Sequence, residues 1–355
     1  MPSFLRRCLK NAPMTLSSLL LVLPLLLASC ASGRDASAPL VSRSRYLMGT
    51  ACTLSVPSSV DVDGAADAAF GEIARIERLV STWRSDSDLS RLNAAPAGRA
   101  LAVSGEVIDL LDRATALSRD TGGAFSPLAG RLIAMWDLRG EGRVPPEDEV
   151  RGAAAAIAGG GLRLDRERRT AARLGDVAVE EGGFAKGYAL DRAIEELRER
   201  GVPSAILDFG GQVALFGFRK AVEIDIAHPE DRQRSAVRLA VKSGSVATSS
   251  GSEKYFEKMG ERFSHIVDPR SGRALPPAGS ATAIHQEALV ADALSTALYV
   301  LGPREGLALA DREGFAEIWL VPEQDGSYRV VRSAAASALP LEIHENLKTW
   351  KKEWQ

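Results

Sequence analysis

The sequence predicts an α+β protein with one large domain. Its predicted strands and helices follow one another without the regular alternation of a doubly wound parallel sheet. No internal repeat is present, and no change in composition marks a linker between residues 41 and 347. A length of 355 residues is compatible with one large domain or with two or three smaller ones, so the missing linker favours one.

The composition is that of a folded chain with a sizeable core. Hydrophobic residues make up 45% of the chain and charged residues 25%, while 32 Gly and 17 Pro are too few for a collagen-like or low-complexity protein. The 44 basic and 46 acidic residues are well mixed, and the formal net charge is −2. The sequence has no strongly basic segment that could bind a phosphate backbone, so no nucleic-acid partner is expected.

The N-terminus has the pattern of an export signal. Arg6, Arg7 and Lys10 precede an apolar stretch over residues 16–27, which ends in Leu27-Ala-Ser-Cys30. The stretch is too short for a stable transmembrane helix. Small residues before a cysteine resemble the lipobox of bacterial lipoproteins, in which Cys30 becomes the lipidated first residue. The alternative is an ordinary secretory signal with an incidental cysteine.

This interpretation divides the chain into four parts. Residues 1–29 are a lipoprotein signal peptide, residues 30–43 a tether, residues 44–347 the folded domain and residues 348–355 a charged tail. The protein is expected on the periplasmic side of a bacterial membrane, anchored by lipid at Cys30. Cys8 leaves with the signal and Cys30 carries lipid, so Cys52 has no partner for an intramolecular disulfide.

The first predicted elements of the domain are a strand and two helices. Residues 45–56 alternate and are rich in β-formers, which predicts one strand. Apolar residues at helical spacing predict amphipathic helices over 65–80 and 105–119. Asp120-Thr-Gly-Gly123 supplies the stop of the second helix.

The middle of the domain is predicted to be mostly strand. A hairpin over 162–165 and 170–174 comes first, and a Gly-rich run then opens a helix that extends to about residue 200. A Gly-Gly turn joins the next two strands. The predicted strands are residues 204–209, 212–216, 222–227, 235–241 and 245–248.

The C-terminal part is predicted to hold two helices and two strands. A buried helix over 288–301 is followed by another over 303–312, which Gly302-Pro303 opens. Strands over 317–321 and 328–333 close the domain.

The run Glu180-Glu-Gly-Gly-Phe-Ala-Lys-Gly187 is one candidate for chemistry. Exposed backbone N–H groups at a helix start suit a phosphate, and Lys186 adds a positive charge. The run is neither a Walker motif nor a Rossmann fingerprint. Gly-rich turns before helices are common, so a purely structural turn is the alternative.

A second candidate lies in the helix over 288–301. Asp292 and Thr296 are four residues apart in an otherwise apolar segment and project from the same face. A carboxylate on a buried helix needs a partner, and Mg²⁺ accepts carboxylate, hydroxyl and carbonyl oxygens. Alternatively, Asp292 accepts hydrogen bonds from backbone donors of another loop.

A third candidate is His265, which lies in a predicted strand that is followed by a Pro/Gly turn. His265 has the chemistry of a general base, and Asp268 would orient either the imidazole or the loop. A lone histidine in a strand is also often structural. No serine nucleophile elbow and no HExxH motif occurs in the sequence.

In their order along the chain, these runs resemble the ApbE family, the exported FAD:protein FMN transferases. The matching blocks extend from about residue 44 to 322 and predict an ApbE-like α+β domain. They are Tyr46-Leu-Met-Gly-Thr50, Ser81-Thr-Trp-Arg-Ser-Asp-Ser-Asp-Leu-Ser-Arg-Leu-Asn93, Gly122-Gly-Ala-Phe-Ser-Pro127, Gly182-Gly-Phe-Ala-Lys-Gly-Tyr-Ala-Leu-Asp191, Asp208-Phe-Gly-Gly211, Ala247-Thr-Ser249, Phe263-Ser-His-Ile-Val-Asp-Pro-Arg-Ser-Gly272 and Ala291-Asp-Ala-Leu-Ser-Thr-Ala297.

The resemblance implies an enzyme that binds FAD and Mg²⁺ and transfers FMN to a Thr or Ser hydroxyl of a partner protein, with release of AMP. It places His265 as the candidate base. It implies metal ligands in the side chains of Asp292 and Thr296 and in the backbone oxygens of Gly183 and Ser295. The residues implied at the flavin-nucleotide site are Met48, Trp83, Ala124, Phe125, Ser126, Glu180, Lys186 and Ile266.

The chain departs from the family pattern at three of these positions. The family commonly has Tyr where Trp83 stands, and Asp where Ser126 and Glu180 stand. Trp keeps a stacking plane, Glu keeps the charge but adds a methylene, and Ser removes a charge. Two alternative functions therefore accompany the transferase. One is an FAD pyrophosphatase that releases FMN and AMP, and the other is a non-catalytic flavin-binding lipoprotein.

Overall fold

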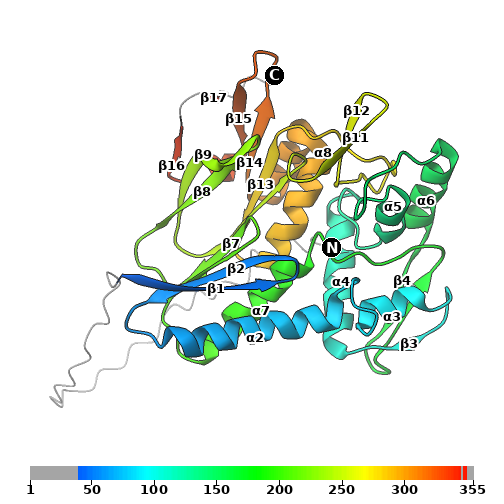
Figure 1. Ribbon diagram of the computed structural model, residues 1–355, viewed down its shortest axis with the longest axis horizontal. Coiled ribbons are helices and arrows are strands. Elements are labelled where there is room, and N and C mark those ends of the chain that lie inside the picture. Colours follow the sequence, from blue (N-terminus) through cyan, green and yellow to red (C-terminus); the bar gives the residue numbers. More distant parts are fainter. Residues whose placement is uncertain (1–38, 345–346, 350–355) are drawn as a thin grey trace, which may run out of the picture.

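A computed structural model describes residues 39–344 and 347–349 and confirms the predicted α+β class. Its largest element is a nine-stranded sheet in the order β1-β2-β6-β7-β10-β13-β14-β15-β17 (Figure 1). Neighbouring strands are antiparallel except β15 and β17, which are parallel. The strands are β1 (Leu40–Leu47), β2 (Thr50–Pro57), β6 (Ala205–Phe209), β7 (Gln212–Phe216), β10 (Gly244–Ser250), β13 (Ser280–His285), β14 (Ala316–Pro322), β15 (Tyr328–Arg332) and β17 (Leu347–Thr349).

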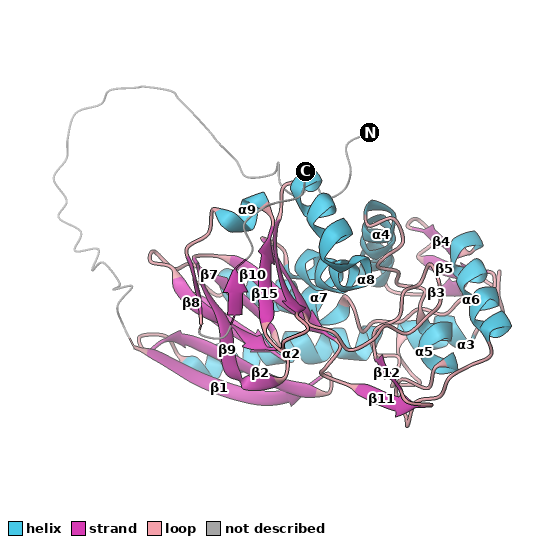
Figure 2. Ribbon diagram, turned by 90° about the horizontal axis from the view of Figure 1, so that it is seen from above, coloured by secondary structure: helices cyan, strands magenta, loops and turns pink. Residues whose placement is uncertain are grey.

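Helices cover one face of this sheet and a smaller sheet covers the other (Figure 2). On the helical face, α7 (Ala185–Glu199) packs between α2 (Val62–Val80) and α8 (Ala288–Glu313), and α8 lies on β10 and β13. α4 (Gly105–Asp120) packs beside α8. The opposite face packs against a three-stranded sheet made of β8 (Val222–His228), β9 (Asp231–Val241) and β16 (Leu341–Ile343).

A smaller lobe extends beyond the end of the large sheet, at the right of Figure 1. It holds a second three-stranded sheet, a two-stranded hairpin and short helices. These elements are β3 (Leu101–Ala102), β4 (Gly161–Asp165), β5 (Thr170–Leu174), β11 (Tyr255–Lys258), β12 (Glu261–Ser264), α3 (Asp88–Ala94), α5 (Gly130–Met135) and α6 (Glu147–Gly159). Outside this lobe, the short helix α9 (Ala334–Ser337) lies on β14. Across the described residues, no helix is long and apolar enough to traverse a bilayer.

The helix predictions for α2, α4 and α7 are confirmed. Gly302 has φ 73° and ψ 173°, which interrupts α8 where the sequence predicts two separate helices. The single strand predicted over 45–56 is wrong, because Met48 (φ 44°) and Gly49 (φ 80°) form a turn between β1 and β2. The two positive φ values suit the right-handed twist of a tight hairpin.

Two predicted boundaries also differ from the structure. β1 begins at Leu40, so residues 40–43 belong to the sheet and not to the predicted tether. Residues 347–349 form β17, which overlaps the predicted charged tail. The predicted signal peptide and Cys30 lie outside the described residues.

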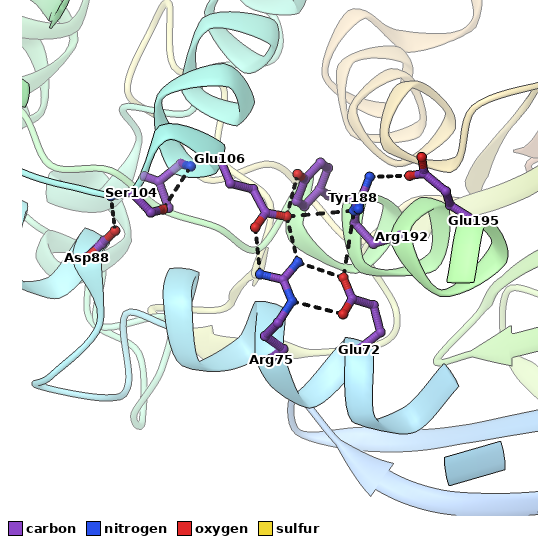
Figure 3. A network of polar contacts seen from close by, with 9 residues as sticks. Glu72, Arg75, Asp88, Ser104, Glu106, Tyr188, Arg192 and Glu195 are labelled. Atoms are coloured by element: carbon purple, nitrogen blue, oxygen red, sulfur yellow. Dashed lines mark hydrogen bonds and ion pairs between the residues drawn. The ribbon is translucent and has the colours of Figure 1, made fainter. Parts of the chain in front are cut away.

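A network of charged side chains connects α2, α4 and α7 (Figure 3). Arg75 donates to both carboxylates of Glu72 and Glu106 at 2.6–2.9 Å. The Tyr188 hydroxyl donates to the same Glu106 at 2.8 Å, and burial, together with this hydrogen bond, raises the pKa of Tyr188. Since Tyr188 lies in the first turns of α7, the network fixes the helix start that carries Lys186.

Candidate active site

A cavity of about 280 Å³ lies where the N-terminal turns of α7 and α8 meet β10 and the loop after β12. Twelve of the residues implied by the resemblance line it. They are Trp83, Ala124, Phe125, Ser126, Glu180, Gly183, Lys186, His265, Ile266, Asp292, Ser295 and Thr296. Five separate chain segments therefore converge on one site.

Met48 is the one implied cofactor residue that does not line the cavity. It is half-buried, and it packs against the main hydrophobic core from the β1–β2 turn. The nearby Thr50 packs against Gly210, which does line the cavity. A Cβ on Gly210 would lie 2.7 Å from the Thr50 methyl group. Met48 therefore lies outside the cavity lining, and its place at the flavin-nucleotide site stays a prediction.

The start of α7 presents a backbone donor and a lysine to the cavity. The N-cap residue Phe184 makes no side-chain capping bond, while the Ala185 N–H donates to the Glu181 carbonyl and the Gly187 N–H to Asp292. Of these three first-turn residues, Lys186 has the backbone N–H that remains for an anionic ligand among the described residues. Lys186 lies in that first turn and lines the cavity. A Cβ on Gly183 would lie 3.3 Å from both Phe125 Cε2 and Thr296 Oγ1, so glycine brings this backbone close to α8.

Asp292 is held between the two helices. Its Oδ2 accepts a 2.9 Å hydrogen bond from the Gly187 N–H of α7. Burial raises the pKa of this carboxyl group, and the positive charge of Lys186 opposes the rise. α8 itself is fixed by Asp191, whose two oxygens accept from the backbone N–H groups of Ala288 and Leu289 at 2.7 and 2.9 Å.

Two hydroxyl side chains one turn along α8 from Asp292, those of Ser295 and Thr296, also line the cavity. Ser295 Oγ donates to the Asp292 carbonyl at 2.9 Å and lies 2.9 Å from Ser249 Oγ. Thr296 Oγ1 reaches the same carbonyl at 3.4 Å. Within the described residues, no group of three or more His, Cys, Asp or Glu is placed to hold a metal. One carboxylate with hydroxyl and carbonyl oxygens is a hard donor set that fits Mg²⁺ when a ligand supplies further oxygens.

His265 lines the cavity with its tautomer fixed. Its Nδ1 lies 3.1 Å from the Lys254 carbonyl oxygen, so Nδ1 carries the proton and donates, which leaves Nε2 with a lone pair. Burial lowers the pKa of the imidazole below 6.5. Asp268 accepts from Arg270 at 2.9 Å and braces its own loop. Of the two roles predicted for Asp268, the structure supports the loop.

Arg139, which the sequence did not indicate, contacts both Trp83 and Glu180 at the cavity. The Arg139 guanidinium lies over the Trp83 ring, 4.4 Å from its centroid, and its Nη2 donates to Glu180 at 2.7 and 2.8 Å. Burial and the neighbouring Glu181 raise the pKa of Glu180, and Arg139 opposes this rise. Arg139 stands in an irregular segment without periodicity or a motif, so no sequence signal indicated it.

Ser126 is buried against the cavity wall, and its Oγ accepts from the Leu128 N–H at 3.2 Å. Gln212 is also buried there, and its amide donates to Ser245 Oγ at 3.0 Å and to the Ala288 carbonyl at 2.8 Å. Gln212 thereby joins β7 to β10 and to the start of α8. The hydrogen bonds of these two polar residues hold the cavity wall together. The titratable groups considered for the reaction are Lys186, Asp292 and His265.

Fold and site together define a class: an α+β enzyme whose cavity combines an exposed aromatic ring with a lysine, a histidine and a buried carboxylate. The sequence model of the ApbE family matches residues 48–319. The chain belongs to the ApbE family.

Characterised relatives agree with this assignment. The FAD:protein FMN transferase of Vibrio cholerae is 31% identical over 263 residues, which cover 72% of this chain and 78% of that protein. One from Klebsiella pneumoniae is 31% identical over 289 residues, covering 80% and 90%.

Solved structures agree as well. The crystal structure of the ApbE protein from Thermotoga maritima superposes with a TM-score of 0.76 at 27% identity, covering 84% of this chain and 98% of that one. The apo flavinyl transferase ApbE of Pseudomonas stutzeri gives 0.73 at 30% identity, covering 85% and 96%. Because both superpositions span nearly the whole of the other chain, the likeness extends over the entire domain.

Proposed function

We propose that this protein transfers FMN from FAD to a Thr or Ser hydroxyl of a partner protein and releases AMP, in a reaction that requires Mg²⁺. The observation that carries the proposal is the convergence of Lys186, His265, Asp292 and Thr296 on one cavity that also exposes Trp83. A diphosphate joined to a flat ring system is a ligand that such a combination suits. The names of the relatives point to the same reaction.

The phosphate end of FAD would lie at the starts of α7 and α8. The positive end of the α7 dipole, the Lys186 backbone N–H and the Lys186 ammonium would favour the negative pyrophosphate. Mg²⁺ would be held by the side chains of Asp292 and Thr296 with the carbonyl oxygens of Gly183 and Ser295. Bound there, the cation neutralises charge on the pyrophosphate oxygens.

His265 would act as the general base for the attacking hydroxyl. Its Nε2 accepts this proton while the hydroxyl oxygen forms a bond to the FMN phosphorus. The bond from that phosphorus to the bridging oxygen breaks, and AMP leaves with the bridging oxygen. The Nδ1 hydrogen bond to Lys254 holds the imidazole in the tautomer that this role needs.

We further propose that the enzyme is lipid-anchored at Cys30 on the periplasmic side of a bacterial membrane. The support is the sequence pattern of the N-terminus, where Leu27-Ala-Ser-Cys30 follows an apolar stretch. A protein acceptor on the same side of the membrane would then share the compartment with the cavity.

One incubation separates the transferase from its two alternatives. The purified protein is mixed with FAD, Mg²⁺ and a candidate acceptor protein, and covalent flavin and free FMN are followed over time. A transferase gives acceptor-bound flavin and AMP in equal amounts. Free FMN with AMP, whether or not acceptor is present, would identify a pyrophosphatase, and bound but unchanged FAD would identify a carrier.

A further inference from the structure

The inference concerns Arg139, which lies between an exposed indole and two carboxylates at the cavity. Trp83 is 70% exposed, and Arg139 lies over its ring at 4.4 Å. Arg139 Nη2 also pairs with Glu180 at 2.7 Å and approaches Glu181 at 3.6 Å, and it donates to Thr82 Oγ1. The guanidinium is thus fixed in position through one of its three nitrogens.

The other two nitrogens of this guanidinium have free N–H groups. All hydrogen bonds and ion pairs of Arg139 to described residues run through Nη2. Nε and Nη1 therefore keep three N–H donors in one plane beside the cavity. A rigid, planar fork of this kind recognises acceptor oxygens that lie in a plane.

The charges around Arg139 indicate which part of a dinucleotide meets it. Two carboxylates, Glu180 and Glu181, surround one guanidinium, so the cluster carries a net charge of about −1 when both are ionised. A phosphate would be repelled there. A neutral flat ring with carbonyl oxygens would accept from the free N–H groups and stack on the exposed indole.

We propose that Arg139 determines specificity for the flavin end of FAD. The isoalloxazine ring carries two carbonyl oxygens along one edge, whereas adenine has none. The free donors of Arg139 would meet that edge while Trp83 supplies the stacking surface. This inference rests on the proposed use of FAD, and it assigns to Arg139 a role that composition and motifs do not indicate.

The experiment measures binding of two halves of the substrate, FMN and ADP, to the purified full chain by titration calorimetry. Arg139→Ala should weaken FMN binding about tenfold, the range for losing one or two hydrogen bonds to a bound ligand. ADP binding should change less than twofold, and the loss should appear in KM for FAD. Equal weakening of both ligands, or unchanged FMN binding in a folded variant, would overturn the inference.

Two further variants keep the test decisive. Arg139→Gln retains an amide donor near Glu180 and substitutes if Arg139→Ala lowers the melting temperature. Arg131→Ala is the matched control, since Arg131 lies in the adjacent α5, pairs with the exposed Asp176 at 2.8 Å and does not line the cavity. If wild type binds FMN in an Arg139-dependent manner but transfers none, the proposed function fails while the binding role stands.

Discussion

The backbone N–H of Gly187 donates a 2.9 Å hydrogen bond to Asp292 Oδ2, and this bond joins α7 to α8 at the cavity. The glycine is required for the approach, because a Cβ at position 187 would lie 2.2 Å from the Ala288 carbonyl oxygen and 2.8 Å from Asp292 Cβ. The helix that carries Lys186 and the helix that carries the candidate metal ligands are thereby fixed to each other.

Gly187→Ala should accordingly destabilise the protein by about 1–3 kcal/mol, the usual cost of overpacking. Gly152→Ala is the control, since a Cβ at this position of α6 meets nothing within 4 Å and alanine favours the helix by about 1 kcal/mol. Urea unfolding of both variants measures the difference. Equal stability of the two would show that the α7–α8 contact adapts to a methyl group.

Asp292→Asn should raise the Mg²⁺ concentration required for transfer by about 10²-fold or more, because it removes the only carboxylate among the proposed ligands. Thr296→Ala deletes a neutral ligand and should have a smaller effect, roughly tenfold. A magnesium titration of initial rates checks both. Asp225→Asn serves as control, since Asp225 pairs with Arg238 on β9, outside the cavity. Unchanged titrations in both site variants would make these residues structural.

His265→Ala should slow transfer by roughly 10²–10⁴, the usual range for loss of a general base, with FAD affinity nearly unchanged. The neutral imidazole is the active form, so the wild-type rate should rise with pH and reach its plateau. Burial lowers the pKa of His265 below 6.5, which places the plateau at lower pH than an unperturbed imidazole would. Single-turnover rates from pH 5 to 8 test this, with His228→Ala on β8 as control. A rate in the His265 variant within a few-fold of wild type excludes the base role.

Glu317 should make the protein less stable as pH rises. Its carboxyl group is fully buried on β14, neither oxygen has a hydrogen-bond partner among the described residues, and burial raises its pKa well above 4.5. Below pH 4.5 both the folded and the unfolded chain hold the proton. Above it the unfolded chain ionises first, so stability falls up to the folded pKa. Glu317→Gln should flatten this dependence in urea unfolding between pH 5 and 8. Parallel curves would contradict it.

Cys30→Ser should release the protein from the membrane fraction without loss of flavin transfer, because the anchor and the cavity lie in different parts of the chain. Fractionation followed by a salt wash and immunodetection measures the change. Retention of the variant in washed membranes would refute lipidation at Cys30.

Much of the fold and the site could be predicted because their signals are local. The periodicity of α2 and the Gly-rich entry to α7 are readable within a few residues, and the spacing of Asp292 and Thr296 fixes their common helix face. The β1–β2 turn was missed because Met48 adopts a positive φ, which residues other than glycine rarely do. Arg139 was missed because its place at the site depends on contacts with Trp83 and Glu180, which are 56 and 41 residues away in sequence. Only the folded chain brings these three residues together.

The position of the cavity within the large sheet has a consequence for amide hydrogen exchange. Its floor includes Ala247 on β10, which pairs with Gln212 of β7 and Ala283 of β13 in the middle of nine strands, and α8 covers one face of β10. Amide hydrogens there should exchange only when the whole domain unfolds. The wall at Trp83 and Arg139 comes from irregular segments held by side-chain contacts, so its amides should exchange through local opening. One half of the binding site would then stay fixed while the other half opens and closes around it, which gives a long nucleotide a way in without disturbing the helices that hold its phosphates.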